Sequence, residues 1–170
     1  GMGGILAARL ANLTYAEAAA VPVAGLEALH FMRAAHIQPG KNVLVIGAGG
    51  SIGTYAIQLA KHFGAEVTGV DRPEKLELLR AIGAGHVIDY TQGDYTRSGK
   101  AYDLIIDVVG KRGVAKRLKL LKEGGDYFLA FVSPANLLLK MWLSLAGGKK
   151  LRIESAIQKK EDLVFLRELI

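Results

Sequence analysis

The sequence predicts an α/β protein with a doubly wound sheet of six parallel strands. Short apolar runs alternate with amphipathic segments from residue 43 to the end of the chain. One run, Asp103 to Val109, is almost continuously apolar, which is typical of a strand covered on both faces. A glycine-rich turn, Gly47 to Gly53, separates the first apolar run from an amphipathic segment. Together these observations favour the strand order 3-2-1-4-5-6 with right-handed crossovers.

The first forty residues are predicted to be helical. An alanine-rich helix is expected to end near Pro22, because proline lacks the amide that continues a helix. A second helix is expected from about Val23 to Ala35, followed by a turn at Gln38-Pro39-Gly40. Residues 1–40 should therefore form a helical lead-in that packs on a domain of residues 41–170.

Strands and helices alternate in the rest of the chain. Strands are expected at residues 43–46, 66–70, 86–89, 103–109, 126–132 and 150–155. Helices are expected at residues 52–63, 74–82, 111–121, 133–145 and 161–170, with a loop or single helical turn at 91–100. Pro73 and Gly83 stand where a helix begins and ends, and Gly124-Gly125 is expected to end the helix before the fifth strand.

Composition and charge argue against several classes of protein. The chain has 170 residues, a net charge of +6 and no cysteine. A disulfide framework and a thiolate metal site are thus excluded, which suits a cytoplasmic protein. The basic residues are dispersed and not interleaved with aromatic ones, so no nucleic-acid partner is expected. Polar residues interrupt the most apolar run, Tyr127 to Ala146, so no membrane partner is expected either.

The glycine turn has the features of a phosphate-binding loop. Its sequence, GAGGSIG at residues 47–53, fails the literal G-x-G-x-x-G pattern because Ile52 stands where the last glycine is required. Two variants fit, with Gly50 and Gly53 in both and either Ala48 or Gly47 in the first position. Gly50 would let the backbone approach a pyrophosphate, and Gly53 would let helix and strand pack closely. A glycine-rich turn that binds nothing is the alternative, and the strand, helix and following acid favour a dinucleotide.

Asp71 and Arg72 bear on which dinucleotide is bound. A carboxylate at the tip of the second strand accepts hydrogen bonds from the adenosine ribose hydroxyls, which favours NAD and repels a 2′-phosphate. Arg72 could instead bind that phosphate, so NADP is the alternative. We expect NAD, because the acid stands at the strand tip. Asp71 could also act only as a cap for the helix that follows Pro73.

The chain resembles the medium-chain dehydrogenase/reductase superfamily. The resemblance rests on AAAVPVAGLEAL, GAGGSIG, GVD, GAGHVIDY, YDLIIDVVG and GGDYFL, which occur in this order at residues 18–29, 47–53, 69–71, 83–90, 102–110 and 124–129. The likeness is greatest to its quinone-oxidoreductase-like and alcohol-dehydrogenase-like branch. It implies a Rossmann domain that binds NAD or NADP, and places the GroES-like catalytic domain, with any zinc ligands, outside this chain.

The resemblance also implies which residues hold the cofactor. Pyrophosphate contacts are implied at Gly50, Ser51 and Ile52, and adenosine selection at Asp71 and Arg72. The full set of candidate cofactor-binding residues is Gly47, Gly50, Ser51, Ile52, Gly53, Asp71, Arg72, Tyr90 on the adenine side, and Val108, Val109, Gly110 and Phe131 on the nicotinamide side.

No catalytic or metal-binding constellation is predicted. The histidines, His30, His36, His62 and His86, share no ligand spacing and are expected to be surface or packing residues. Asp103 and Asp107 lie at the ends of one strand, where they are expected to serve turns. The resemblance implies the cofactor-binding domain of an oxidoreductase that transfers hydride between nicotinamide and a carbonyl, quinone or enone substrate. The isolated chain is expected to be inactive.

Two other functions fit parts of the sequence. A nucleotide-sensing module without catalysis would use the same glycine turn. A Rossmann-like methyltransferase would also use it, although no terminal antiparallel hairpin is apparent in the sequence. The resemblance further implies a homodimer formed through the edge strand at residues 150–155, and an unpaired edge suits that role.

Overall fold

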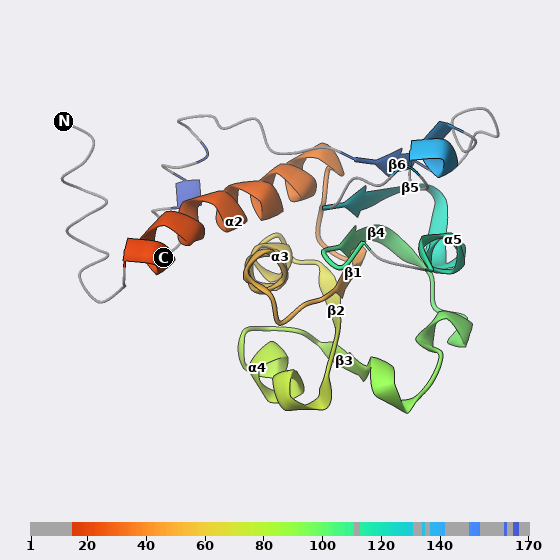
Figure 1. Cartoon of the computed structure of the whole chain (residues 1–170), viewed down its shortest axis with the longest axis horizontal. Coiled ribbons are helices and arrows are strands. Elements are labelled where there is room, and N and C mark those ends of the chain that lie inside the picture. The colour runs from red at the N-terminus through yellow and green to blue at the C-terminus, as the bar shows by residue number, and fades with distance from the viewer. Residues whose placement is uncertain are drawn as a thin grey trace.

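The computed structural model describes residues 15–110, 113–130, 134, 137–141, 150–153, 162 and 165–166. Its centre is a six-stranded sheet of order β3-β2-β1-β4-β5-β6 (Figure 1). All of its strand pairs are parallel, which confirms the predicted sheet. The strands are β1 (Asn42–Ile46), β2 (Glu66–Asp71), β3 (His86–Asp89), β4 (Tyr102–Asp107), β5 (Leu121–Leu129) and β6 (Lys150–Arg152).

Helices cover both faces of the sheet. The α-helices are α2 (Tyr15–Ala34), α3 (Ser51–His62), α4 (Leu76–Ala81) and α5 (Val114–Arg117). Short 3-10 helices are η1 (Pro73–Lys75), η2 (Tyr90–Gln92), η3 (Tyr95–Arg97) and η4 (Leu118–Leu120). In Figure 1, α2, α3 and α4 lie on one side of the sheet and α5 on the other. No helix in the described ranges is long and apolar enough to cross a membrane.

The core is divided by the sheet, as the alternation of side chains along a strand requires. Val43 and Val45 of β1 belong to a cluster with α2, α3 and α4, whereas Leu44 and Ile46 belong to a cluster with α5 and η4. All four side chains are buried, so β1 is apolar on both faces. This burial fixes the carboxyl end of β1, where the glycine turn begins, against helices on both sides.

The prediction that the first helix ends near Pro22 was wrong. Helix α2 runs without interruption from Tyr15 to Ala34, with Pro22 inside it. A proline removes one helical hydrogen bond and disfavours the helical conformation of the residue before it, but it does not forbid a helix. The half after Pro22 is anchored by packing, because Leu26, Leu29 and Phe31 are buried in the core beside α3.

The fourth strand is shorter than predicted. It ends at Asp107 and not at Val109. The reason is local: the Asp107 carboxylate accepts hydrogen bonds from the amides of Val109 and Gly110, which turns the chain out of the sheet. Apolar sequence continues for two residues past the strand because Val108 still packs against the core.

The connection between β4 and β5 also differs from the prediction. In place of a helix over residues 111–121, the described part holds one turn of α5 followed by η4, and β5 already begins at Leu121. The expected strand at 126–132 is therefore longer at its start, and Gly124-Gly125 lies inside it. Leu121 is buried and pairs with Tyr102, which extends the chain early, and the register then skips to Asp126 opposite Leu104.

Two other differences are small. The helix expected at residues 74–82 begins with η1, and the stretch expected at 91–100 to be a loop or one turn contains two 3-10 turns. The last strand ends at Arg152 within the expected 150–155, of which 154–155 lie outside the described residues. Of the helices expected at 133–145 and 161–170, residues 134, 137–141, 162 and 165–166 are described and are helical.

Candidate functional site

The glycine turn connects β1 to α3. Gly47 has a φ of +76°, a backbone conformation that glycine adopts without strain, and its amide donates to the carbonyl of Val70 at 3.0 Å. Gly50 is the N-cap of α3, and no side chain caps this helix. The first amides of any α-helix have no intrahelical acceptor, and here they lie at the positive end of a twelve-residue helix without a side-chain cap. This arrangement suits a phosphate group.

The glycines of the turn differ in the space around them. A Cβ added at Gly53 would lie 2.6 Å from the carbonyl oxygens of both Gly47 and Ala48, so only glycine lets α3 pack this closely on the turn. A Cβ at Gly50 would meet only the Gly47 oxygen, at 3.3 Å. Gly53 therefore has a packing role, and Gly50 leaves its outer side open.

Asp71 binds the glycine turn to the end of β2. Its Oδ2 accepts a hydrogen bond from the Gly49 amide at 2.6 Å, and its Oδ1 accepts one from the Arg72 amide at 2.8 Å. A Cβ at Gly49 would lie 3.0 Å from this carboxylate, so the contact also requires a glycine there. The structure thus gives Asp71 a role in shaping the turn that the sequence did not predict. Asp71 does not cap η1: the N-cap residue of η1 is Arg72, and no side chain forms a capping hydrogen bond there.

A cavity of about 610 Å³ opens at the carboxyl ends of β1, β2 and β4. Its lining includes candidate residues from four separate parts of the sequence, namely Gly47, Asp71, Arg72, Tyr90 and Val109. The remaining lining residues are Ile46, Val70, Gly93, Asp94, Tyr95 and Arg117, of which the last three are polar residues that the sequence reasoning missed.

The other candidate residues lie beside this cavity or apart from it. Gly50 and Ser51 lie at the exposed start of α3, with Ile52 partly buried against the core. Val108 packs against the core cluster formed with α2, α3 and α4, and the Gly110 amide donates to Asp107. Phe131 lies outside the described residues.

Two consecutive turns place tyrosines in the cavity wall. The sequence Asp-Tyr-Thr occurs at residues 89–91 and again at 94–96. In each copy the aspartate accepts hydrogen bonds from the amide and the hydroxyl of the threonine two residues later. These hydroxyl bonds lower the pKa of both aspartates. Tyr90 and Tyr95 follow these aspartates, and both line the cavity. The repeated Asp-Tyr-Thr triplet is the feature of the sequence that could have indicated Tyr95 as a second lining residue.

Each tyrosine is paired with an arginine from another element. Arg72 Nε donates to the Tyr90 hydroxyl at 3.1 Å on the exposed rim, and this contact raises the pKa of Arg72. Tyr95 is more buried than Tyr90, and burial raises its pKa although the nearby charge of Arg117 acts to lower it. The cavity therefore has one cation–tyrosine pair at its rim and another at its base.

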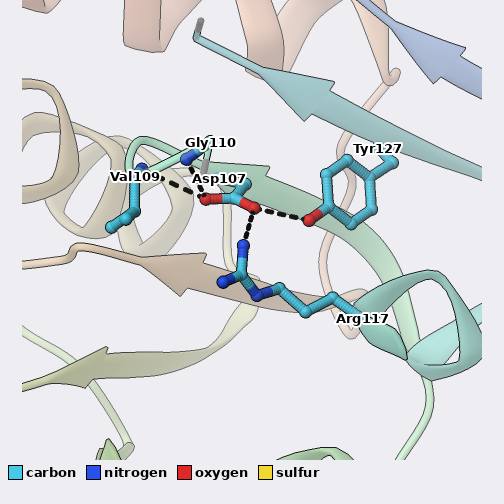
Figure 2. A network of polar contacts seen from close by, with 5 residues as sticks. All are labelled: Asp107, Val109, Gly110, Arg117 and Tyr127. Carbon is cyan, nitrogen blue, oxygen red and sulfur yellow. Dashed lines mark hydrogen bonds and ion pairs between the residues drawn. The ribbon is translucent and has the colours of Figure 1, made fainter. Parts of the chain in front are cut away.

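Asp107 is the centre of a buried polar network (Figure 2). It is 0% exposed, and its Oδ1 accepts from the amides of Val109 at 3.1 Å and Gly110 at 2.9 Å. Its Oδ2 accepts from Arg117 Nη1 at 2.5 Å and from the Tyr127 hydroxyl at 2.6 Å. The expected turn role of Asp107 is confirmed, and the ion pair with Arg117 is an addition that the sequence did not indicate.

The network raises the pKa of two of its members, Tyr127 and Arg117. Burial raises the pKa of Tyr127, and the nearby negative charge of Asp107 raises it further, so the phenol stays a donor. Burial alone would lower the pKa of Arg117. The charge of Asp107, its hydrogen bond with Arg117 and the nearby hydroxyls of Tyr95 and Tyr127 together outweigh burial and raise this pKa. Arg117 is therefore charged throughout the physiological pH range.

The described residues contain no group of three or more His, Cys, Asp or Glu side chains that could hold a metal ion. His30 packs edge-on against Phe31 and Phe128, and His62 packs in the same way against Phe63. These two histidines are packing residues, as expected.

Comparison with known proteins places the chain in a family. Residues 51–153 match the family model described as zinc-binding dehydrogenase. The chain is 41% identical over 124 residues to the 2-methylene-furan-3-one reductase of Solanum lycopersicum, covering 72% of this chain and 31% of that protein. It is 37% identical over 123 residues to the chloroplastic NADPH-dependent alkenal/one oxidoreductase of Arabidopsis thaliana, covering 71% and 31%. It spans about a third of the length of these curated relatives.

Solved structures show the same architecture. The quinone oxidoreductase of Coxiella burnetii matches with a TM-score of 0.79 and 28% identity, covering 92% of this chain and 49% of that one. The Escherichia coli quinone oxidoreductase complexed with NADPH matches with a TM-score of 0.75 and 25% identity, covering 93% and 52%. The matched family domain is the cofactor-binding part of medium-chain dehydrogenases/reductases. The chain therefore belongs to the zinc-binding dehydrogenase family of the medium-chain dehydrogenase/reductase superfamily.

Proposed function

We propose that this chain binds a nicotinamide dinucleotide across the carboxyl ends of β1, β2 and β4. The observation that carries the proposal is the cavity that joins the glycine turn to Asp71. In this proposal the pyrophosphate lies at the start of α3, near Gly50, Ser51 and Ile52, and the adenosine lies beside Asp71 and Tyr90. Bound there, the nicotinamide would supply or accept the hydride in the reaction of the whole enzyme.

The residues around the cavity suit such a cofactor. The uncapped amides of α3 offer donors to phosphate oxygens. Asp71 uses one hydrogen bond on each oxygen for the Gly49 and Arg72 amides, and a carboxylate oxygen has a second lone pair for a ribose hydroxyl. Val109, 39% exposed, and Ile46 provide an apolar surface for a ring.

We propose that the chain binds NAD in preference to NADP because of the negative charge of Asp71. The carboxylate lies inside the cavity and repels a 2′-phosphate, whereas the guanidinium of Arg72 is at the rim and already donates to Tyr90. The relative from Arabidopsis thaliana is named as NADPH-dependent, and the structure from Escherichia coli holds NADPH. The two cofactors therefore have to be compared directly.

The experiment is a calorimetric titration of the chain with NADH, NADPH and S-adenosylmethionine, repeated on Asp71→Ser. We expect the wild-type chain to bind NADH more tightly than NADPH. Because hydrogen bonds to a charged group are worth about 1.5–3 kcal/mol, Asp71→Ser should weaken NADH by roughly tenfold or more. NADPH should gain relative to NADH.

Asp89→Ser is the matched control. Asp89 ends β3 in register with Asp71 of β2, but its carboxylate caps η2 and it is not a lining residue of the cavity. It should leave the NADH-to-NADPH ratio unchanged. An unchanged ratio in Asp71→Ser would show that Asp71 only shapes the turn. Binding of S-adenosylmethionine in place of either dinucleotide would favour the methyltransferase alternative, which the all-parallel pairing of the described strands argues against.

The activity of the whole protein is part of the same proposal. We propose hydride transfer between nicotinamide and a carbonyl, quinone or enone substrate, with the GroES-like domain of the superfamily supplying the substrate contacts. The curated relatives include a furanone reductase and an alkenal oxidoreductase, which supports an activated alkene or carbonyl as the substrate class. The isolated chain should accordingly bind the cofactor without turnover.

We further propose a homodimer through β6. This strand pairs with β5 on one side, and no described strand pairs with its other side. Sedimentation of the chain with and without NADH tests the dimer. A change of oligomeric state when NADH is added would instead favour the nucleotide-sensing alternative. A cytoplasmic location also stays a proposal, because relatives carry chloroplastic and mitochondrial names.

A further inference from the structure

The Asp107–Arg117 ion pair connects two walls of the cavity. On one side, Asp107 Oδ1 holds the amides of Val109 and Gly110 and so fixes the wall that Val109 forms over Gly47. On the other side, Arg117 lines the cavity together with Tyr95, which stands on the second Asp-Tyr-Thr turn, and the charge of Arg117 acts on the Tyr95 hydroxyl. The two walls come from segments that do not pair in the sheet, and the ion pair is a direct link between them.

Arg117 is suited to this link by its shape and its burial. Its side chain is 13% exposed, lines the cavity beside Tyr95 and donates to Asp107 Oδ2, the same oxygen that accepts from the Tyr127 hydroxyl. A guanidinium has five donors in one plane, so it can bind several acceptors in fixed directions, whereas a lysine ammonium is a single point of charge. The position therefore requires arginine and not simply a cation.

We propose that Arg117, held by Asp107, is a positioning residue that sets Tyr95 and the Tyr95 wall for the adenosine half of the cofactor. The inference rests on the proposed function, since Asp71 in the same cavity marks the adenosine half. Arg117 acts through Tyr95 and the Val109 turn. Its removal should change how well the cavity fits adenosine, beyond any change in the stability of the fold.

The experiment is a double-mutant cycle on the full chain, with ADP-ribose and NADH as the two titrated ligands. The variants are Arg117→Lys, Tyr95→Phe and the two combined, each checked for folding by its urea midpoint. Arg117→Lys keeps the charge opposite Asp107 and loses the planar donors. We expect it to weaken ADP-ribose binding by about tenfold, the effect of losing one hydrogen bond to a charged group.

Non-additivity is the decisive result. If Tyr95 is positioned through Arg117, the double variant should bind ADP-ribose no more weakly than Arg117→Lys alone. The matched control is Arg152→Lys, because Arg152 of β6 forms a similar ion pair with Asp126 of β5, and neither residue lines the cavity. It should leave ADP-ribose binding unchanged.

The outcomes separate this inference from the proposed function. If the wild-type chain binds neither ADP-ribose nor NADH, both are wrong. If it binds both ligands, and the Arg117 and Tyr95 variants bind as the wild type does or lose affinity additively, only the positioning role is overturned. A fall in the urea midpoint without a change in ADP-ribose binding by the folded protein would likewise assign Arg117 a purely structural role.

Discussion

Replacing Asp107 by asparagine should destabilise the fold far more than its position at the end of a strand suggests. Asparagine has nearly the same shape and keeps a carbonyl oxygen for the amides of Val109 and Gly110. Its amide group, however, would face Arg117 and Tyr127, which both donate to Asp107 Oδ2 in the wild-type protein. The substitution thus leaves a buried guanidinium without its counter-charge.

The magnitude follows from the burial of this pair. The side chain of Asp107 is 0% exposed and that of Arg117 is 13% exposed. Breaking a buried ion pair by removing one partner costs about 3–5 kcal/mol. A domain of this kind has a free energy of unfolding of about 5–15 kcal/mol in total, so the loss is a large share of it.

Asp103→Asn is the control on the same strand. Asp103 also forms ion pairs, with Lys122 and Lys41, but those lysine side chains are 40% and 47% exposed. Pairs of that kind contribute about 0–1 kcal/mol each. We expect urea unfolding followed by far-ultraviolet circular dichroism to give a loss at Asp107 that exceeds the loss at Asp103 by about 2 kcal/mol or more. Equal losses in the two variants would refute the reasoning from burial.

Two further expectations concern stability. Gly53→Ala should lower the free energy of unfolding by about 1–3 kcal/mol, and with it the thermal midpoint, because the added Cβ would lie 2.6 Å from two backbone oxygens. Gly50→Ala should have a much smaller effect, and equal midpoints would contradict the packing role of Gly53. Burial would raise the pKa of Asp103, but the hydrogen bonds from Lys122 and the Asn42 amide and the charges of Lys122 and Lys41 together outweigh burial and lower this pKa. Because the folded pKa is depressed, the stabilisation should be complete above about pH 4 and be lost as pH falls through the folded value, so urea midpoints of the wild type and Asp103→Asn should converge in acid.

The sheet was predictable because its signals are local. The apolar runs at β1 and β4, the glycine turn after β1 and the acid at the end of β2 are all close together in sequence, and short crossovers leave few possible strand orders. The errors occurred where distant contacts outweigh local preference. Leu121 is extended because it pairs with Tyr102, and α2 continues through Pro22 while its second half packs in the core.

The site divides in the same way. The sequence by itself determined the glycine turn, with Gly53 as its packing residue, and the place of an acid, Asp71, at the end of β2, because these follow from backbone geometry and spacing within one βαβ unit. Only the tertiary structure decided that Tyr95 and Arg117 join Asp71 around one cavity, and that Asp107 is buried against Arg117 and Tyr127. Those residues lie on separate elements, and the sheet order is what brings them together. No local pattern records such a contact.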